Sequence, residues 1–350
     1  MPKKRTTLPK DFEGLLDRGD FDVLRAVFDR CALDARGGSY KQVALAFPAC
    51  PDALARWLVE NGADIEATDR DGKTPLHTRA RSHRGRIAEL LQLGADPNPG
   101  AGSYHGTPLH AAADAAVADN VRLLLEHGAQ VDARNAARQT PLEYMLQRAS
   151  NATLERVSTV ARLLLDAGAT PSDEARQHVI AIGERFEFHR ANFNPACVNE
   201  ASAALNRLYA MTGVAPVPRR TMHDGASPIT VRDGSWDERY DRLWDLLVPS
   251  QGAAATVQGE VVRIPGRLAR EIHGNGAVNW DRDYVRMADA WLGYVAVGEP
   301  LAPDERAEAL EIIADVKRKA GDTDRLREFA VAWVARNPEP IPLPAPPYSR

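Results

Sequence analysis

The first half of the chain repeats a pattern of apolar and polar positions. Short apolar runs are followed four times by a Gly-Ala pair, and each run predicts the last turns of a helix. A glycine directly after such a run is typical of a helix C-terminus, because it readily adopts the left-handed backbone conformation. The four glycines are Gly62, Gly94, Gly128 and Gly168, spaced 32, 34 and 40 residues apart. The longer last interval predicts about seven extra residues near Ser150 to Val157.

A second motif marks the start of the helix before each of the later runs. Its three copies stand 33 residues apart, and they are Thr74-Pro75-Leu76-His77, Thr107-Pro108-Leu109-His110 and Thr140-Pro141-Leu142-Glu143. Threonine is a favourable N-cap, and proline fits the first helical position, where its missing N–H is not needed. We expect His77 and His110 to join neighbouring repeats through hydrogen bonds, and not to bind a metal or act in catalysis.

This motif at this spacing is the signature of ankyrin repeats, and residues 10–230 resemble the ankyrin repeat family. The resemblance implies an all-α fold, an α-solenoid of helix pairs with short β-turn fingers. We expect an N-terminal helical cap over residues 1–35 and about five repeats over residues 36–230, the outer ones degenerate. It also implies a protein-protein interaction scaffold without cofactors, which binds through its finger tips and the concave face of its first helices.

The resemblance places candidate binding residues at the tips of the fingers. Tips are expected near residues 36–40, 69–73, 98–105 and 134–138. Residues such as arginine and tyrosine often anchor protein interfaces, although a polar finger tip can also be simply solvated. The candidate partner-binding residues are Asp69, Arg70, Asp71, Lys73, Tyr104, His105, Arg134, Asn135 and Arg138.

After Ser227 the 33-residue pattern stops, and a different helical region follows. We predict a small C-terminal helical domain over residues 235–336, with helices near 236–248, 254–273, 281–296, 304–320 and 323–336. Residues 337–350 are rich in proline, which predicts an extended or disordered tail. We favour a solvated tail over a polyproline-type peptide ligand.

The predicted helix at 254–273 carries a charged stripe directly beside its apolar stripe. Small residues on its far side allow a second helix to approach closely. The charged stripe and the polar residues after it are Glu260, Arg263, Arg267, Glu271, Asn275, Asn279, Trp280 and Asp281. We favour a salt-bridge network between helices; a polar patch that contacts a partner and an acid/base site are the alternatives.

Residues 235–300 are also similar to a helical module of uncharacterised bacterial proteins, some of which carry ankyrin repeats. This likeness implies a bacterial, cytoplasmic protein and brings no mechanism with it.

Composition narrows the function. The 350 residues are 44% apolar and 26% charged, as in soluble globular proteins, and no apolar run approaches the ~20 residues that span a bilayer. The formal charge is near +1 over residues 1–220 and near −5 over residues 221–350, without the clustered basic excess of a nucleic-acid surface. The three cysteines are widely spaced, which favours a reducing cytoplasm and predicts no metal site.

We therefore expect a cytoplasmic protein, monomeric or weakly oligomeric, with a protein partner and no nucleic acid or membrane. Two other functions stay open. One is a bacterial immunity or inhibitor protein that neutralises a toxin enzyme. The other is an enzyme with a site in the groove between the repeats and the C-terminal helices, where Glu260, Glu271 and Asp281 act as acids or bases and Arg263 and Arg267 hold an anion.

Overall fold

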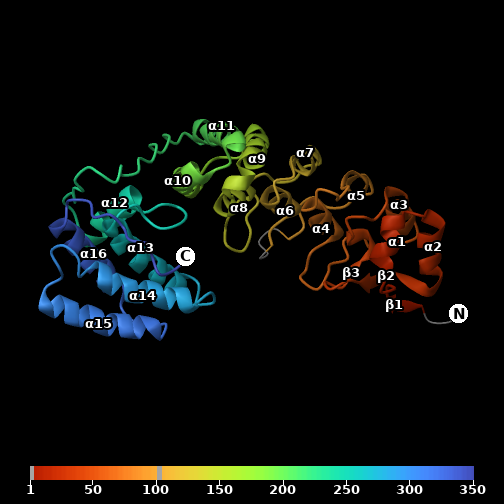
Figure 1. Cartoon of the computed structure of the whole chain (residues 1–350). Coiled ribbons are helices and arrows are strands. Elements are labelled where there is room, and N and C mark those ends of the chain that lie inside the picture. Colours follow the sequence, from red (N-terminus) through yellow and green to blue (C-terminus); the bar gives the residue numbers. More distant parts are fainter. Residues whose placement is uncertain (1–3, 101–104) are drawn as a thin grey trace. The chain divides into compact units, whose positions relative to one another are not determined.

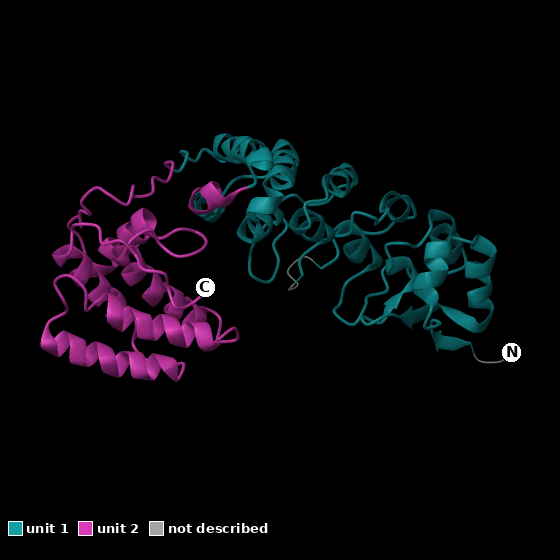
Figure 2. Ribbon diagram, in the orientation of Figure 1, with its two compact units in different colours: residues 1–186, 194–217 teal, residues 187–193, 218–350 magenta. Residues whose placement is uncertain are grey.

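The computed structural model describes residues 4–100 and 105–350, and the chain divides into two compact units (Figures 1 and 2). Unit 1 comprises residues 1–186 and 194–217, and unit 2 comprises residues 187–193 and 218–350. Residues 218–230, which the sequence analysis assigned to the repeats, thus group with unit 2. The side chain of Ile229 is buried in the core of that unit.

Unit 1 begins with a small sheet and two helices. The elements are β1 (Arg5–Thr7), α1 (Phe12–Arg18), α2 (Phe21–Arg30), β2 (Cys31–Gly37) and β3 (Gln42–Val43). Strand β1 pairs in parallel with β2, and β2 pairs antiparallel with β3. Two helices lie where a helical cap was predicted, but the flanking strands had not been indicated by the pattern. The ring of Phe12 packs edge-on against those of Phe28 and Phe47 and fills this end of the core.

The rest of unit 1 is a series of helix pairs, so the predicted all-α ankyrin solenoid is confirmed. The inner helices α4, α6 and α8 each begin at the proline of one copy of the threonine-proline motif, and a second helix follows each of them. The elements in order are η1 (Ala44–Ala46), α3 (Asp52–Glu60), α4 (Pro75–Ala80), α5 (Ala88–Gln92), α6 (Pro108–Asp114), α7 (Ala118–Glu126), α8 (Pro141–Arg148), η2 (Asn151–Thr153), α9 (Leu154–Asp166), α10 (Asp173–His189) and α11 (Pro195–Thr212). The end of α10 and the short helix η3 (Arg190–Asn192), which lie within residues 187–193, belong to unit 2.

Helix ends follow the sequence signals. Thr74 caps α4 through its side chain, with Pro75 at the first helical position. The glycines that follow α3, α5, α7 and α9 have φ angles between 83° and 99°, in the left-handed region. The extra residues predicted near Ser150 form η2 and lengthen α9 to 13 residues, against 9 in α7.

The third residue of each inner helix links its repeat to the next one. In α4 this residue is His77, whose Nδ1 accepts a hydrogen bond from the backbone N–H of Thr74. Because Nδ1 accepts, Nε2 carries the proton, and it donates to the carbonyl oxygen of Gly106 in the next repeat at 2.8 Å. His110 of α6 repeats this arrangement with the carbonyl oxygen of Gln139 at 3.0 Å. The expectation that these histidines join neighbouring repeats is confirmed.

In the third repeat a glutamate replaces the histidine. Glu143 Oε2 accepts from the backbone N–H of Thr140 at 2.8 Å, and Oε1 accepts from Ser172 Oγ at 2.5 Å. Burial opposes ionisation here, but the hydrogen bonds from Ser172 and Thr140 outweigh it and lower the pKa of Glu143. The link to the next helix pair is therefore kept with a different side chain.

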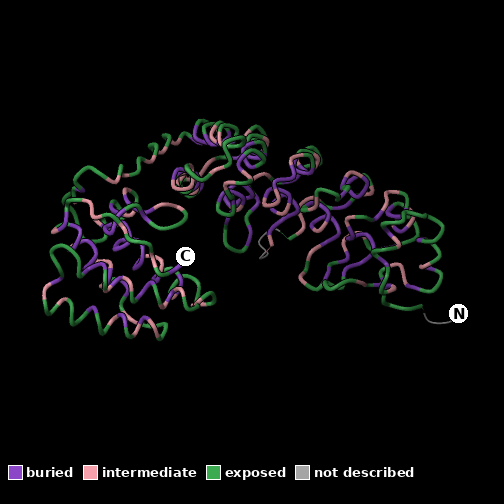
Figure 3. The backbone as a smooth tube through the Cα atoms, viewed as in Figure 1, coloured by how far each residue is buried: buried purple, intermediate pink, exposed green. Residues whose placement is uncertain are grey.

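Unit 2 is built around one central helix. Its elements are α12 (Trp236–Leu247), α13 (Val257–Ala269), the π-helical turn η4 (Arg270–Gly274), α14 (Arg282–Tyr294), α15 (Pro303–Lys317) and α16 (Thr323–Arg336). Helix α13 packs against α12, α14 and α16, so that all but two of its residues, Gly266 and Arg267, are buried (Figure 3). A Cβ atom at Gly266 would lie 2.3 Å from the ring of Trp244, which shows how closely α12 approaches its small-residue face.

The proline-rich tail packs on unit 2, so the expectation of a solvated tail is wrong. The backbone N–H of Val257 donates to the carbonyl oxygen of Ile341 at 2.8 Å. The fully buried amide of Gln258 donates to the carbonyl oxygens of Asn337 and Glu339 and accepts from the N–H of Ile341. Prolines prevent a helix in this segment, but the carbonyl and N–H groups that remain find partners on α13.

The two linking histidines predict how the stability of unit 1 depends on pH. Burial lowers the pKa of both His77 and His110 below the ordinary value of 6.5. Below about pH 6.5 the unfolded chain therefore binds more protons than the folded one, and the free energy of unfolding falls with falling pH, by up to ~1.4 kcal/mol per pH unit for each histidine. Calorimetry of unit 1 between pH 7.5 and 5 measures this slope.

The control for this prediction is the double variant His77→Gln/His110→Gln, in which an amide takes over the two hydrogen bonds without titrating. We expect its unfolding temperature to change less between pH 7.5 and 5 than that of the wild type. Equal slopes in the two proteins would show that these histidines do not set the pH dependence.

Candidate functional site

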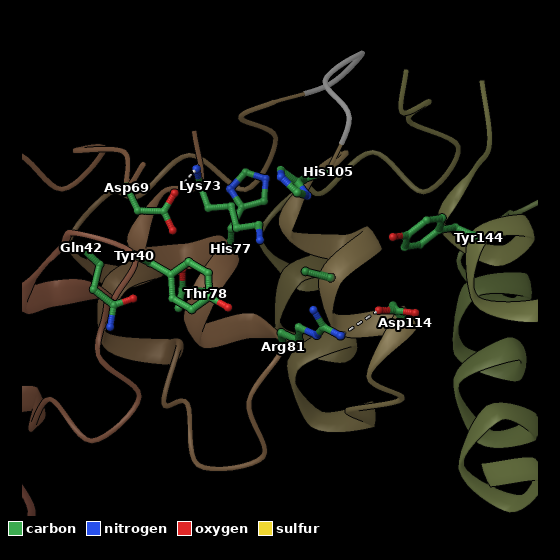
Figure 4. Close-up of a pocket in the computed structure, with 11 residues that line it drawn as sticks. Tyr40, Gln42, Asp69, Lys73, His77, Thr78, Arg81, His105, Asp114 and Tyr144 are labelled. Atoms are coloured by element: carbon green, nitrogen blue, oxygen red, sulfur yellow. Dashed lines mark hydrogen bonds and ion pairs between the residues drawn. The ribbon is translucent and has the colours of Figure 1, made fainter. Parts of the chain in front are cut away.

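Residues at the same distance from each copy of the motif lie side by side on the inner helices. Four residues after the motif threonine stand Thr78, Ala111 and Tyr144, and three residues further stand Arg81, Asp114 and Gln147. Most of them, together with finger residues, line a pocket of about 200 Å³ on unit 1 (Figure 4). We call it the inner-surface pocket, and its lining residues are Tyr40, Gln42, Asp69, Lys73, His77, Thr78, Arg81, His105, Ala111, Asp114 and Tyr144.

Two carboxylates in this pocket are engaged within the protein. Asp69 is 8% exposed, and its Oδ1 accepts from the backbone N–H groups of Asp71 and Lys73 at 2.8 and 2.9 Å. Asp114 lies between two arginines, 2.7 Å from Arg148 Nε and 3.4 Å from Arg81 Nη2. The acidic groups thus shape the finger and join neighbouring inner helices.

Two tyrosines, Tyr40 and Tyr144, stand at opposite sides of the pocket (Figure 4). An arginine lies over the ring of each one. The guanidinium of Arg70 lies 5.6 Å from the ring centre of Tyr40, and that of Arg148 lies 5.1 Å from the ring centre of Tyr144. The ring of Tyr40 is 49% exposed. Cation–π pairs hold exposed arginines and aromatic rings in defined positions, which lowers the entropy that they lose on binding a partner.

The lining of the pocket also includes His105 and Thr78. Burial lowers the pKa of His105, and the nearby charge of Lys73 adds to the effect. The hydroxyl oxygen of Thr78 is buried and has no hydrogen-bond partner among the residues that the structure describes. Buried polar atoms normally find a partner, so this unpaired hydroxyl is an exception among the residues that line the pocket.

The predicted finger-tip residues separate into three groups. Asp69, Lys73 and His105 line the pocket, and Arg70 and Asp71 form an ion pair beside it. Arg134 and Arg138 are exposed on the third finger, where Arg134 contacts the carbonyl oxygen of Arg138. Tyr104 lies outside the described residues.

Asn135 corrects the expectation that the whole third finger faces a partner. Its side chain is only 4% exposed, and its Oδ1 accepts from the backbone N–H of Gln139 at 3.0 Å. The amide therefore shapes the turn and is not presented to a partner.

The helix residues of the pocket had not been singled out, although a signal for them exists. Thr78, Arg81, Asp114 and Tyr144 can be found by counting forward from the motif, since the 33-residue period stacks equal positions. Attention to the finger tips alone misses them.

The polar residues predicted on the C-terminal helices form two separate clusters in unit 2. In the first, Glu260 and Arg263 are 0% and 1% exposed and form a paired ion bridge, with N–O distances of 2.7 and 3.1 Å. Glu260 also accepts from the backbone N–H of Ala254 at 2.7 Å and from the Tyr348 hydroxyl at 2.6 Å. Arg263 donates to the carbonyl oxygen of Arg350 at 2.8 Å, so the tail completes this cluster.

The second cluster surrounds Glu271. The carboxylate accepts from the side chain of Asn275, from the backbone N–H of Asn279 at 2.6 Å and from the Tyr284 hydroxyl at 3.3 Å. Burial acts against ionisation, but these hydrogen bonds outweigh it and lower the pKa of Glu271. Trp280 stacks on the ring of Tyr284, with 5.2 Å between the ring centres. The cluster holds the turn after α13 against α14.

Two further predicted residues lie at the edge of these clusters. Asp281 pairs with Arg350 of the tail, 2.5 Å away. Arg267 is half-buried and makes no hydrogen bond or ion pair with any residue that the structure describes, and desolvation lowers its pKa, with the charge of Arg263 as a further cause. The salt-bridge network favoured from the sequence is thus present for Glu260 and Arg263 and does not include Arg267.

Neither a metal-binding cluster nor a membrane-spanning helix is present among the described residues. No three histidine, cysteine, aspartate or glutamate side chains among them are grouped in a way that would hold a metal ion. None of the helices that the structure describes combines the length and the apolar character needed to cross a membrane.

Comparison with known families identifies the repeats. The family described as "Ankyrin repeats (many copies)" matches residues 43–92, and "Ankyrin repeat" matches residues 105–136. A solved ankyrin repeat domain from Acinetobacter baumannii is 22% identical, with a TM-score of 0.42 over 58% of this chain and 98% of that domain.

Curated relatives match over the same kind of region. Ankyrin repeat and SOCS box protein 16 of Mus musculus is 34% identical over 122 residues, which are 32% of this chain and 27% of that protein. Putative E3 ubiquitin-protein ligase XBAT35 of Arabidopsis thaliana is 43% identical over 91 residues, 25% of this chain and 20% of that protein. Ankyrin repeat and SOCS box protein 5 of Mus musculus is 36% identical over 124 residues, 35% of this chain and 33% of that protein. The chain spans a third or less of the length of these relatives.

The first cluster of unit 2 predicts that the tail stabilises this unit through one hydroxyl. Tyr348→Phe removes a donor from the buried carboxylate of Glu260, and we expect it to lower the free energy of unfolding of unit 2 by ~1–3 kcal/mol. Chemical denaturation followed by tryptophan fluorescence measures this change, because five of the six tryptophans lie in unit 2. The matched control is Tyr40→Phe on the exposed ring of unit 1, for which we expect a change within about 0.5 kcal/mol.

A double-mutant cycle separates this hydrogen bond from a packing effect. In the background of Glu260→Gln, the change Tyr348→Phe should destabilise less than in the wild type, because the charged acceptor is gone. Additive effects of the two changes would show that the hydroxyl and the carboxylate do not interact.

Proposed function

Because residues 43–92 and 105–136 of this chain match the ankyrin repeat family, we propose that unit 1 is a protein-binding scaffold whose partner docks on the inner-surface pocket and the fingers around it. One observation carries the proposal: two arginine–tyrosine pairs stand on either side of the pocket, Arg70 with Tyr40 and Arg148 with Tyr144. Arginine and tyrosine are the residue types most enriched among the anchors of protein interfaces.

The exposure of these side chains supports the proposal. The side chains of Arg70, Arg81 and Arg148 are 58%, 60% and 50% exposed, yet each is held by an ion pair. An arginine that is both exposed and fixed in place loses little rotamer entropy on binding. These side chains are therefore already ordered in the free protein, so that binding of a partner costs less side-chain entropy and its affinity is higher.

We place the binding role above an enzymatic one. The acid/base alternative relied on Glu260 and Glu271, and both carboxylates accept several internal hydrogen bonds. Glu260 has no exposed surface, so a substrate reaches it only if the tail leaves. The names that mention a ligase or a SOCS box belong to relatives of which this chain spans at most a third. From these relatives we carry over only one property, the binding of a protein by the repeats.

The immunity or inhibitor function is a narrower form of the same proposal. It keeps the binding scaffold and adds a toxin enzyme as the partner. The acidic balance of residues 221–350 suits a basic target. It stays a prediction.

Alanine variants of the tyrosines test the proposal. With a partner recovered by affinity purification on the whole chain, we expect Tyr40→Ala/Tyr144→Ala to weaken binding by tenfold or more, equivalent to ~1.4 kcal/mol or more. Calorimetric titration measures the dissociation constant, and circular dichroism checks that the variant is folded.

The matched control is Arg162→Ala, which changes an exposed residue of the second helix α9. It should bind like the wild type. A folded tyrosine variant that also binds like the wild type would place the partner elsewhere on the chain and contradict the proposal.

A further inference from the structure

The inner-surface pocket and its rim hold more unused hydrogen-bond donors than acceptors. Each of the three carboxylates there is shared between two donors. Asp71 lies 3.5 Å from Arg70 Nε and 3.9 Å from Lys73 Nζ, and Asp114 lies between Arg81 and Arg148. Asp69 accepts from two backbone N–H groups. The carboxylates are thus largely satisfied inside the protein.

The cations are much less satisfied. A guanidinium has five N–H donors and an ammonium has three. Among the described residues, Arg81 forms one ion pair, at 3.4 Å to Asp114, and Lys73 forms one, at 3.9 Å to Asp71. Both side chains keep donors directed at the pocket that they line. The four cations of the pocket and its rim are Arg70, Lys73, Arg81 and Arg148. With the three carboxylates they leave a formal charge of +1 around the pocket.

The volume of the pocket suits one side chain of a protein partner. Pockets for small molecules have volumes of roughly 300–1,000 Å³, and this one has about 200 Å³. Tyr40 and Tyr144 supply aromatic surface on its two sides. A small charged group between two apolar neighbours fits this arrangement.

We infer that the partner presents an aspartate or glutamate side chain to Lys73 and Arg81, with apolar or aromatic neighbours that contact Tyr40 and Tyr144. The inference rests on the proposed function, since it names the chemistry of the partner at that same surface. A basic side chain is excluded from the pocket because it would meet Lys73 and Arg81 with like charge, and like-charge contacts oppose binding. A partner without charge would leave the donors of both cations desolvated and unpaired, which opposes binding as well.

Selection from a random peptide library tests the inference without a known partner. The immobilised whole chain is panned against phage-displayed 12-residue peptides, with the same panning on a Tyr40→Ala/Tyr144→Ala protein as the reference. We expect peptides selected only by the wild type to share an aspartate or glutamate beside an aromatic or aliphatic residue. Shared neutral or basic motifs would overturn the inference and leave the proposed function standing. If no peptide depends on the two tyrosines, both are overturned.

Charge variants then test the two cations. Binding of a selected fluorescein-labelled peptide is measured by fluorescence anisotropy. Lys73→Gln/Arg81→Gln should weaken it at least tenfold, and Lys73→Glu/Arg81→Glu further still. The control Arg122→Gln/Arg162→Gln changes the charge equally on second helices α7 and α9 and should leave binding within twofold. Equal loss in both double variants, with the proteins folded, would show a non-specific charge effect and contradict the inference.

The dependence of peptide binding on salt concentration separates the ionic from the apolar contribution to affinity. For the wild type the dissociation constant should rise severalfold between 50 and 300 mM NaCl, because mobile ions screen an exposed ion pair. The Gln variant should show a shallower dependence. Equal salt dependence in the two proteins would contradict an ion pair at Lys73 and Arg81.

Discussion

The hydrogen bond from each inner helix to the next repeat is the interaction on which unit 1 depends. A buried imidazole or carboxylate at the third helical position satisfies its own N-cap on one side and a neighbouring group on the other. The bond fixes the distance and the rotation between repeats, so equal positions stack. The stacked residues then come close enough for Asp114 to contact Arg81 and Arg148. The surface that we propose for the partner is therefore a consequence of the scaffold, because the same period that builds the core also aligns the exposed side chains.

In unit 2, as in unit 1, polar side chains are buried inside a helical core and need hydrogen-bond partners there. Glu260 and Arg263 occupy one face of α13, and burial of an ion pair is favourable only when its remaining hydrogen-bonding groups are satisfied. The tail supplies two of the hydrogen-bond partners for this pair. The Tyr348 hydroxyl donates to Glu260, and the Arg350 carbonyl oxygen accepts from Arg263. Gln258 fixes the tail's backbone in the same way. The sequence favoured a salt-bridge network for this polar stripe, and its Glu260–Arg263 pair is also the place where the tail joins the domain.

The two units differ in how far the sequence predicted them. The motif predicted the inner helices, the links made by His77 and His110, and three residues of the pocket, because repeats are local and their period is visible. Tyr144 and Arg81 follow from the same period but require counting from the motif into the helix. The docking of the tail could not be predicted, since it depends on contacts such as Gln258 with Ile341, 83 residues apart. Proline content describes only the local backbone, and it cannot show that a distant helix offers hydrogen-bond partners. Strands β1 and β3 were missed because three and two residues carry no readable alternation, and the seven residues of β2 do not alternate between buried and exposed positions.

Hydrogen–deuterium exchange of the whole chain, with and without a peptide selected on it, tests the central claim most directly. The claim is that the stacked positions of the inner helices and fingers of unit 1 form the binding surface. It predicts that the bound peptide slows exchange in segments 68–82, 105–115 and 140–148, and leaves the second helices α5, α7 and α9 unchanged. Slowed exchange confined to the second helices or to unit 2 would contradict it.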